Sequence, residues 1–169
     1  MEIEIKKIQI NQRLSQETLC FSADIFINGT KAGVAKNHGY GGSTDYHHLG
    51  TDTSRMLIKN AEKYAASLPH RKSDISDRTF PITLCSLIDN IVYKYDNDKK
   101  QAKDFEKGIC FGVRGGMGYK IFGYKGMKIS KELLTPQGRI DVAKLIADAK
   151  LKLKPNEEIL NTNLGNLLK

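Results

Sequence analysis

The strongest indication of the fold is the stretch Leu19-Cys20-Phe21-Ser22-Ala23-Asp24-Ile25-Phe26-Ile27-Asn28-Gly29. Its odd-numbered side chains up to position 27 are apolar, and this period of two is typical of a β-strand with one face on a core. The Asn-Gly pair that follows favours a two-residue hairpin turn, because both turn residues need positive φ. We therefore predict a hairpin whose second strand covers residues 31–36.

Outward from this hairpin, the remaining sequence predicts one α+β domain over residues 1–169. Its parts are a β-hairpin region at 1–36, a Gly/His-rich loop at 37–51, a helical region at 52–107, a second hairpin at 108–125, a helix at 135–154 and a tail at 155–169. Strands and helices occur in separate runs, which favours α+β over alternating βαβ winding. We expect the two antiparallel hairpins to share one sheet and to pack against about three helices.

Capping residues place the expected helices along the chain. Thr51 or Asp52 is expected to cap the first helix, Pro81 to sit in the first turn of the second, and Thr135-Pro136 to begin the third. The charged segment 96–107 either extends the second helix or forms a loop, and the tail has no assigned structure.

Composition indicates a protein that stays in a reducing compartment. The three cysteines form no Cys-x-x-Cys pair, the first six residues are too charged for a signal peptide, and no apolar run approaches a membrane span. We predict a cytoplasmic protein with no membrane association. Homo-oligomerisation stays open.

The net charge of +8 is unevenly distributed. Residues 1–98 hold 12 Lys and Arg against 12 Asp and Glu, whereas residues 99–169 hold 15 against 7 and so account for the whole excess. This asymmetry indicates an anionic partner for the C-terminal half. The alternative is a solvated lysine-rich surface.

The loop after the first hairpin is the main candidate ligand site. Its candidate binding residues are Asn37, His38, Gly39, Tyr40, Gly41, Gly42, Ser43, Thr44, Tyr46, His47 and His48. Glycines allow successive N–H groups to surround an anion, hydroxyls and imidazoles add donors, and tyrosine rings offer stacking faces for a base. The pattern suits a phosphate or nucleotide. The alternative is a long connection whose aromatic side chains pack on the sheet.

A second glycine-rich turn, Arg114 to Lys120, lies in the basic half. Arg114 and Lys120 are the two further residues that we expect to bind an anionic ligand. The alternative is an ordinary hairpin turn with solvated basic side chains.

Metal binding and catalysis receive less support from the sequence. His38, Asp45, His47 and His48 resemble a ligand set, but adjacent histidines point different ways and no established zinc pattern is present. The cysteines fit buried strand or helix positions. We therefore assign no catalytic residue, no metal and no cofactor, and favour a non-catalytic protein.

Three short motifs carry a resemblance over residues 21–47. They are Phe21-x-Ala23, Asn28-Gly29-x-x-x-Gly33 and Asn37-x-Gly39-x-Gly41-Gly42-x-x-Asp45-Tyr46. The pattern resembles small uncharacterised accessory proteins of bacteriophages and mobile elements. The resemblance implies an accessory factor in the cytoplasm of a bacterial host that acts by binding, including binding of host defence proteins or their nucleotide signals.

The leading hypothesis is thus a binding protein for a nucleotide or another phosphate-bearing ligand, with sequestration of a defence signal as its role. Three alternatives remain: a protein–protein inhibitor of a host or defence protein, a nucleic-acid-binding protein, and a small phosphoesterase or metal enzyme.

Overall fold

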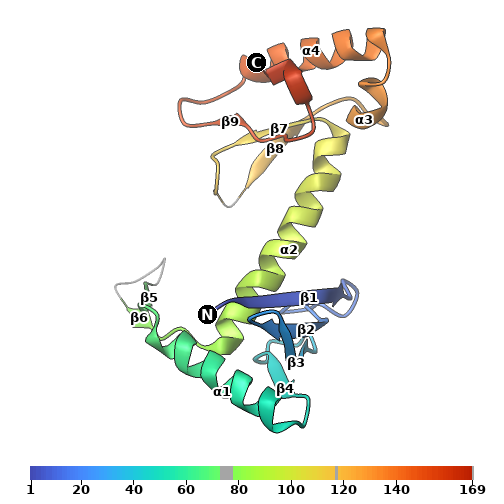
Figure 1. Ribbon diagram of the computed structural model, residues 1–169. Helices are drawn as coiled ribbons and strands as arrows, with labels where there is room; N and C mark the ends of the chain where they lie inside the picture. Colours follow the sequence, from blue (N-terminus) through green and yellow to red (C-terminus); the bar gives the residue numbers. More distant parts are fainter. Residues whose placement is uncertain (73–77, 117, 169) are drawn as a thin grey trace. The chain divides into compact units, whose positions relative to one another are not determined.

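The computed structural model describes residues 1–72, 78–116 and 118–168 (Figure 1). Contacts within the chain divide it into two compact units, unit 1 (Met1–Asp96) and unit 2 (Asn97–Lys169). The boundary falls inside helix α2 (Leu84–Lys107). Each unit is described by itself, and folding as one domain stays a prediction.

Unit 1 contains a four-stranded antiparallel sheet. Its strands are β1 (Ile3–Ile10), β2 (Phe21–Ile27), β3 (Thr30–Asn37) and β4 (Asp45–His48), and they lie side by side in chain order. Asn28 and Gly29 both have positive φ, at 48° and 78°. The predicted hairpin is therefore confirmed.

Helices α1 (Asp52–Ser67) and α2 pack against one face of this sheet, because the apolar side chains of β2 and β3 point to that face. The side chain of Thr51 accepts a hydrogen bond from Ser54 N, which makes it the cap of α1. Two short strands, β5 (Arg71–Lys72) and β6 (Thr79–Phe80), pair between the helices. The core side chains include Phe21, Ala23, Ile25, Ile27, Ala35, Ile58, Ala61, Leu84, Ile88 and Val92.

The opposite face of the sheet carries polar and charged side chains. Asp24 forms ion pairs with Lys31 at 2.9 Å and with Lys7 at 3.6 Å, and both lysines lower the pKa of its carboxyl group, Lys31 through its hydrogen bond most strongly. Lys6 lies over the ring of Phe26. This face is referred to below as the open face.

Unit 2 has its own sheet and its own core. Strands β7 (Ile109–Gly112), β8 (Tyr119–Phe122) and β9 (Glu158–Ile159) form an antiparallel sheet in the order β8-β7-β9. Helices α3 (Ile129–Glu132) and α4 (Pro136–Lys150) and the 3-10 helix η1 (Gly165–Leu168) complete the unit. The core side chains include Ile109, Phe111, Ile129, Val142, Leu145, Ile146, Ala149 and Leu164.

The α+β class and both hairpins are confirmed, but the expectation of one shared sheet is wrong. The second hairpin pairs with β9 from the tail, so it belongs to a separate sheet. Residues 96–107 are helical, and the second helix begins at Leu84, three residues after Pro81. The helix predicted at 135–154 ends at Lys150. Within the described residues, no helix combines the length and the apolar character needed to cross a membrane.

Candidate functional site

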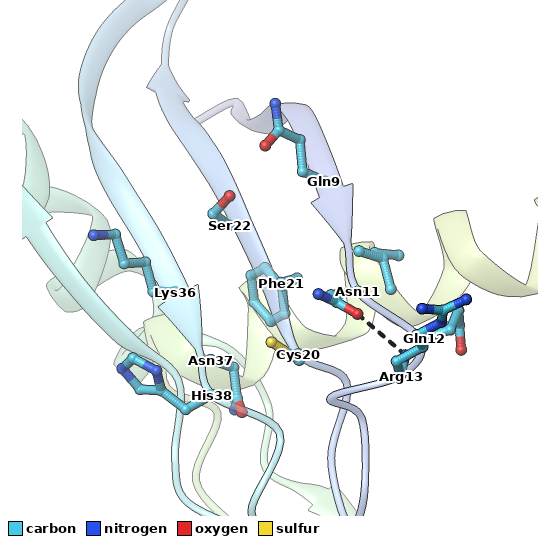
Figure 2. A pocket seen from close by; sticks show the side chains of 11 residues that line it. Gln9, Asn11, Gln12, Arg13, Cys20, Phe21, Ser22, Lys36, Asn37 and His38 are labelled. Carbon is cyan, nitrogen blue, oxygen red and sulfur yellow. Dashed lines mark hydrogen bonds between the residues drawn. The ribbon is translucent and has the colours of Figure 1, made fainter.

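A hollow of about 630 Å³ lies at one end of the unit 1 sheet (Figure 2). Residues 9–13, 20–22 and 36–38 line it, so its walls come from the ends of β1, β2 and β3 and from the loops that follow or precede them. Gln9 pairs with Ser22, and Ser22 pairs with Lys36, which places these three residues in one row across the open face. The volume falls in the range of small-molecule sites.

The lining of the hollow is basic and otherwise neutral. Arg13, Lys36 and His38 line it, and among the residues that the structure describes no Asp or Glu does. Figure 2 shows Lys36 and His38 on one side and Arg13 on the other, with Phe21 and Asn11 between them. In the described part of the chain, none of the three basic residues forms an ion pair. Asp45 pairs with Lys36 in the β3–β4 register but does not line the hollow. This charge balance suits an anion.

The wall that carries Arg13 is held by local hydrogen bonds. Asn11 Oδ1 accepts from Arg13 N at 3.1 Å, as the dashed line in Figure 2 shows. Gln12 Nε2 donates to Oδ1 of the buried Asp96 at 2.7 Å, and Ser15 Oγ accepts from Cys20 N. The wall is therefore tied to α2 and to the start of β2.

Asn37 forms the floor where the glycine-rich loop begins, and its amide is fully engaged. The side chain is 6% exposed. Its Oδ1 accepts from Thr18 Oγ1 and Gly39 N, both at 2.9 Å, and its Nδ2 donates to Gly42 O and Thr44 Oγ1. Asn37 thus shapes the loop.

The backbone groups of the glycines in this loop also form hydrogen bonds within the protein. Gly39 has a φ of +88°, and its carbonyl accepts from the N–H groups of residues 16–18. Its own N–H is bound to Asn37, and the Gly41 N–H is bound to Thr18 Oγ1. Neither N–H can therefore contribute to the expected anion-binding concavity without breaking these contacts.

Thr44 ends the loop beneath the surface. Its hydroxyl donates to Asp89 Oδ1 at 2.5 Å, and its carbonyl accepts from the Cys85 thiol at 3.2 Å. Burial raises the pKa of the Asp89 carboxyl, which the bond from Thr44 partly opposes, and burial raises the pKa of the Cys85 thiol. Thr44 is 2% exposed, so it acts as an anchor to α2.

The last predicted loop residues belong to strand β4. Tyr46 pairs with Ala35, and its hydroxyl donates to Glu62 Oε1 at 2.7 Å; burial raises its pKa. His47 and His48 are both exposed and, as neighbours in a strand, lie on opposite faces. His48 Nδ1 accepts from Gly50 N. The loop is thus shorter than the expected 37–51.

The two predicted ligands of the basic half lie in unit 2, and each is paired there. Arg114 Nε contacts Glu158 Oε1, and Lys120 Nζ contacts Glu157 Oε1 at 3.0 Å. Lys120 also lies over the ring of Phe111. Within the glycine-rich turn, Met117 lies outside the described residues.

Of the predicted site residues, Asn37 and His38 line the hollow, while Tyr40, Gly42 and Ser43 are exposed on the loop beside Asn37. Sequence reasoning missed Gln9, Arg13 and Lys36. A signal for Lys36 was present, since the period of two in the hairpin turns Ser22 and Lys36 away from the core. The position of Arg13 depends on the path of a loop, which no periodicity predicts.

Among residues 1–72, 78–116 and 118–168, no group of three or more His, Cys, Asp or Glu side chains is arranged to hold a metal ion. Comparison of the chain with protein-family models, with curated proteins and with solved structures gave no match.

Proposed function

We propose that unit 1 is a non-catalytic binding unit for a small phosphate-bearing anion, the class that includes nucleotides, and that the hollow between residues 9–13, 20–22 and 36–38 holds it. The observation that carries this proposal is the lining, which combines Arg13, Lys36 and His38 with neutral amides and a hydroxyl and holds no carboxylate from the described part of the chain. Arginine and lysine are the side chains that proteins use most to bind phosphate oxygens.

The neighbouring groups support binding without catalysis. The hydroxyl of Thr44 and the amide of Asn37 are bound within the protein. Among the described residues, the lining includes no carboxylate that would act as a general base. The functional role of the unit is therefore to retain an anion.

The first experiment releases whatever the protein carries from its expression host. The purified protein is denatured, the chain is filtered off, and the filtrate is examined by mass spectrometry beside an ultraviolet spectrum of the intact sample. Because the chain has no tryptophan, a bound base is visible near 260 nm. A released phosphate-bearing compound supports the proposal and names its class.

Thermal unfolding with pyrophosphate and with ATP tests the hollow directly. At a hundredfold excess over the dissociation constant, a ligand stabilises the native state by about 2.7 kcal/mol. We expect Arg13→Ala and Lys36→Ala to reduce this stabilisation, and Lys59→Ala, an exposed lysine on α1, to leave it unchanged. The proposal would be overturned if the ligand stabilised all three variants equally. It would also be overturned if no phosphate compound stabilised the wild type and the filtrate were empty.

A second candidate function is contact with a protein partner through the loops at 11–18 and 38–44. Leu14 and Tyr40 on these loops are 44% and 60% exposed. The loops are held together by the bonds to the Gly39 carbonyl, so the two apolar side chains are presented on a fixed backbone. A partner that the wild type and Arg13→Ala both retain in a pull-down, and Tyr40→Ser loses, would favour this function.

A further inference from the structure

Helix α4 in unit 2 carries a second apolar stripe besides the one that faces the core. The buried side chains of the helix include Val142, Leu145, Ile146 and Ala149. Ile140, Ala143, Ala147 and Leu151 recur at spacings of three and four. Leu151 is the C-cap of α4 and keeps helical backbone angles, so all four lie on one helical face. All four are exposed, Ile140 at 50% and Leu151 at 87%. We name these four residues the outer stripe.

The outer stripe has a shape that suits another helix. Its two central residues, Ala143 and Ala147, are small, whereas Ile140 and Leu151 at its ends are large. A small side chain lets a second backbone approach closely, and a large side chain of that helix can settle between the two ends. A helix thus covers the stripe better than a flat surface does.

The flanks of the outer stripe are mostly basic. The half-buried Asp141 lies beyond the stripe, next to Asp148. At 100° per residue, the nearer flanks hold Arg139 and Lys150 on one side and Lys144 and Asp148 on the other. All four are exposed, and Arg139 Nε donates to Leu133 O, which fixes one of the basic groups near the start of the helix. Unit 2 as a whole holds fifteen Lys and Arg against eight Asp and Glu. The complementary partner is therefore acidic.

We propose that the outer stripe of α4 is a docking surface for an acidic amphipathic helix of a protein partner. The apolar face of that helix covers Ile140 and Leu151, and its carboxylates lie beside Arg139, Lys144 and Lys150. This interaction is independent of the anion site in unit 1.

Other occupants fit the same residues less well. A two-fold pairing with a second copy of the chain would set Arg139 and Lys150 against the same two residues of that copy. A nucleic-acid backbone would leave Leu151, 87% exposed, uncovered. Binding to a lipid surface would bury little apolar area at Ala143 and Ala147, because helices that lie on membranes insert large apolar side chains into the lipid.

The test uses the full chain, labelled with nitrogen-15, and a synthetic helical peptide of about 18 residues, which is five turns. The peptide has leucines at helical spacing and glutamates on both flanks. One control peptide replaces each glutamate by lysine, and another has the same composition in scrambled order. We expect the acidic peptide alone to shift amide signals of residues 139–151, and its affinity to fall as salt rises.

Variants of the protein test the two components of the surface. Leu151→Ser and Lys144→Glu are each expected to weaken binding of the acidic peptide by about tenfold, which is about 1.4 kcal/mol. Lys59→Glu makes the same charge change on α1 and is expected to leave the affinity within about twofold.

Any of four results would overturn the proposal. The first is that the acidic peptide does not shift the amide signals of residues 139–151, or that a control peptide binds as tightly. The second is that Lys144→Glu and Leu151→Ser bind the acidic peptide as tightly as Lys59→Glu does. The third is that phosphatidylserine vesicles or duplex DNA shift the amide signals of residues 139–151 more strongly than the peptide does. The fourth is that sedimentation detects self-association that Leu151→Ser abolishes, which would assign the stripe to a second copy.

Discussion

Thr44 and Asp89 are joined by a hydrogen bond of 2.5 Å from the threonine hydroxyl to Oδ1 of the carboxyl group. Asn37 Nδ2 donates to the same hydroxyl, so a short chain of polar groups runs from the floor of the hollow to helix α2. This chain fixes both ends of the glycine-rich loop, and its energetics can be tested one residue at a time.

Replacement of Asp89 by asparagine is expected to change how stability depends on pH. Burial raises the pKa of the Asp89 carboxyl above its ordinary value of 3.8 in the folded state. The stability that this carboxyl contributes is therefore full below 3.8 and is lost as the pH rises through the folded pKa. Asparagine retains an oxygen acceptor for Thr44 without a charge. In urea unfolding, we expect the stability of the variant relative to the wild type to increase as the pH rises above about 4.

Thr44→Val tests the other member of the Thr44–Asp89 hydrogen bond. It removes the donor to Asp89 and one acceptor of Asn37, and it should cost about 1–2 kcal/mol at neutral pH. If Asp89→Asn instead loses stability relative to the wild type as the pH rises, the carboxylate is stabilising and our assignment of the burial effect is wrong.

Gly39→Ala is expected to destabilise the protein by about 2–3 kcal/mol. Gly39 has a φ of +88°, and a Cβ there would lie 2.2 Å from the Leu14 carbonyl oxygen, a backbone atom that cannot turn aside. Gly42→Ala is the matched control, because a Cβ at Gly42 meets nothing within 4 Å. Its free energy of unfolding should stay within about 0.5 kcal/mol of the wild type. Equal effects at the two glycines would contradict the described loop.

Asn161→Leu is expected to destabilise unit 2 by about 3 kcal/mol. Asn161 is 4% exposed; its Oδ1 accepts from Cys110 N at 2.6 Å, and its Nδ2 donates to the carbonyls of Phe105 and Gly108. Leucine removes the side-chain partner of the Cys110 N–H and of the Gly108 carbonyl, whereas the Phe105 carbonyl keeps its bond from Asn163 Nδ2. Thr162→Leu changes an exposed neighbour and should have little effect in the same urea titration. If Asn161→Leu unfolded at the same urea concentration as the wild type, water would have to replace the hydrogen bonds of the amide.

The single-domain prediction can be tested in the same experiments. If residues 1–169 unfold as one domain, amide signals from both units disappear at the same urea concentration. Asn161→Leu should then lower the midpoint for signals of the unit 1 sheet as well. Separate midpoints in the wild type would show that the two cores unfold independently.

The first hairpin was predictable because its information is local. A period of two from Leu19 to Ile27 specifies the buried face, and Asn28-Gly29 specifies the turn. The Thr135-Pro136 start of α4 is local in the same way. The division into two sheets was not predictable, because β7 pairs with residues 158–159, far along the chain and without a strand pattern of their own.

For the candidate site, residue types indicated the loop from Asn37 to His48, of which Asn37 and His38 line the hollow, but not the other lining residues. The glycine-rich loop was noticed for its donors, yet the contacts of Asn37, Gly39 and Thr44 are made within the protein. Which polar groups bind one another depends on the approach of residues 15–18, about twenty positions earlier in the sequence. Local patterns hold no information on that approach.

The carbonyl of Gly39, which accepts from three successive N–H groups, also has an evolutionary consequence. Residues 16–18 and Gly39 share one set of bonds, so an insertion or deletion in either loop disrupts both. In descendants of this gene, the lengths of the two loops should be inherited together, and changes of length should accumulate in other connections.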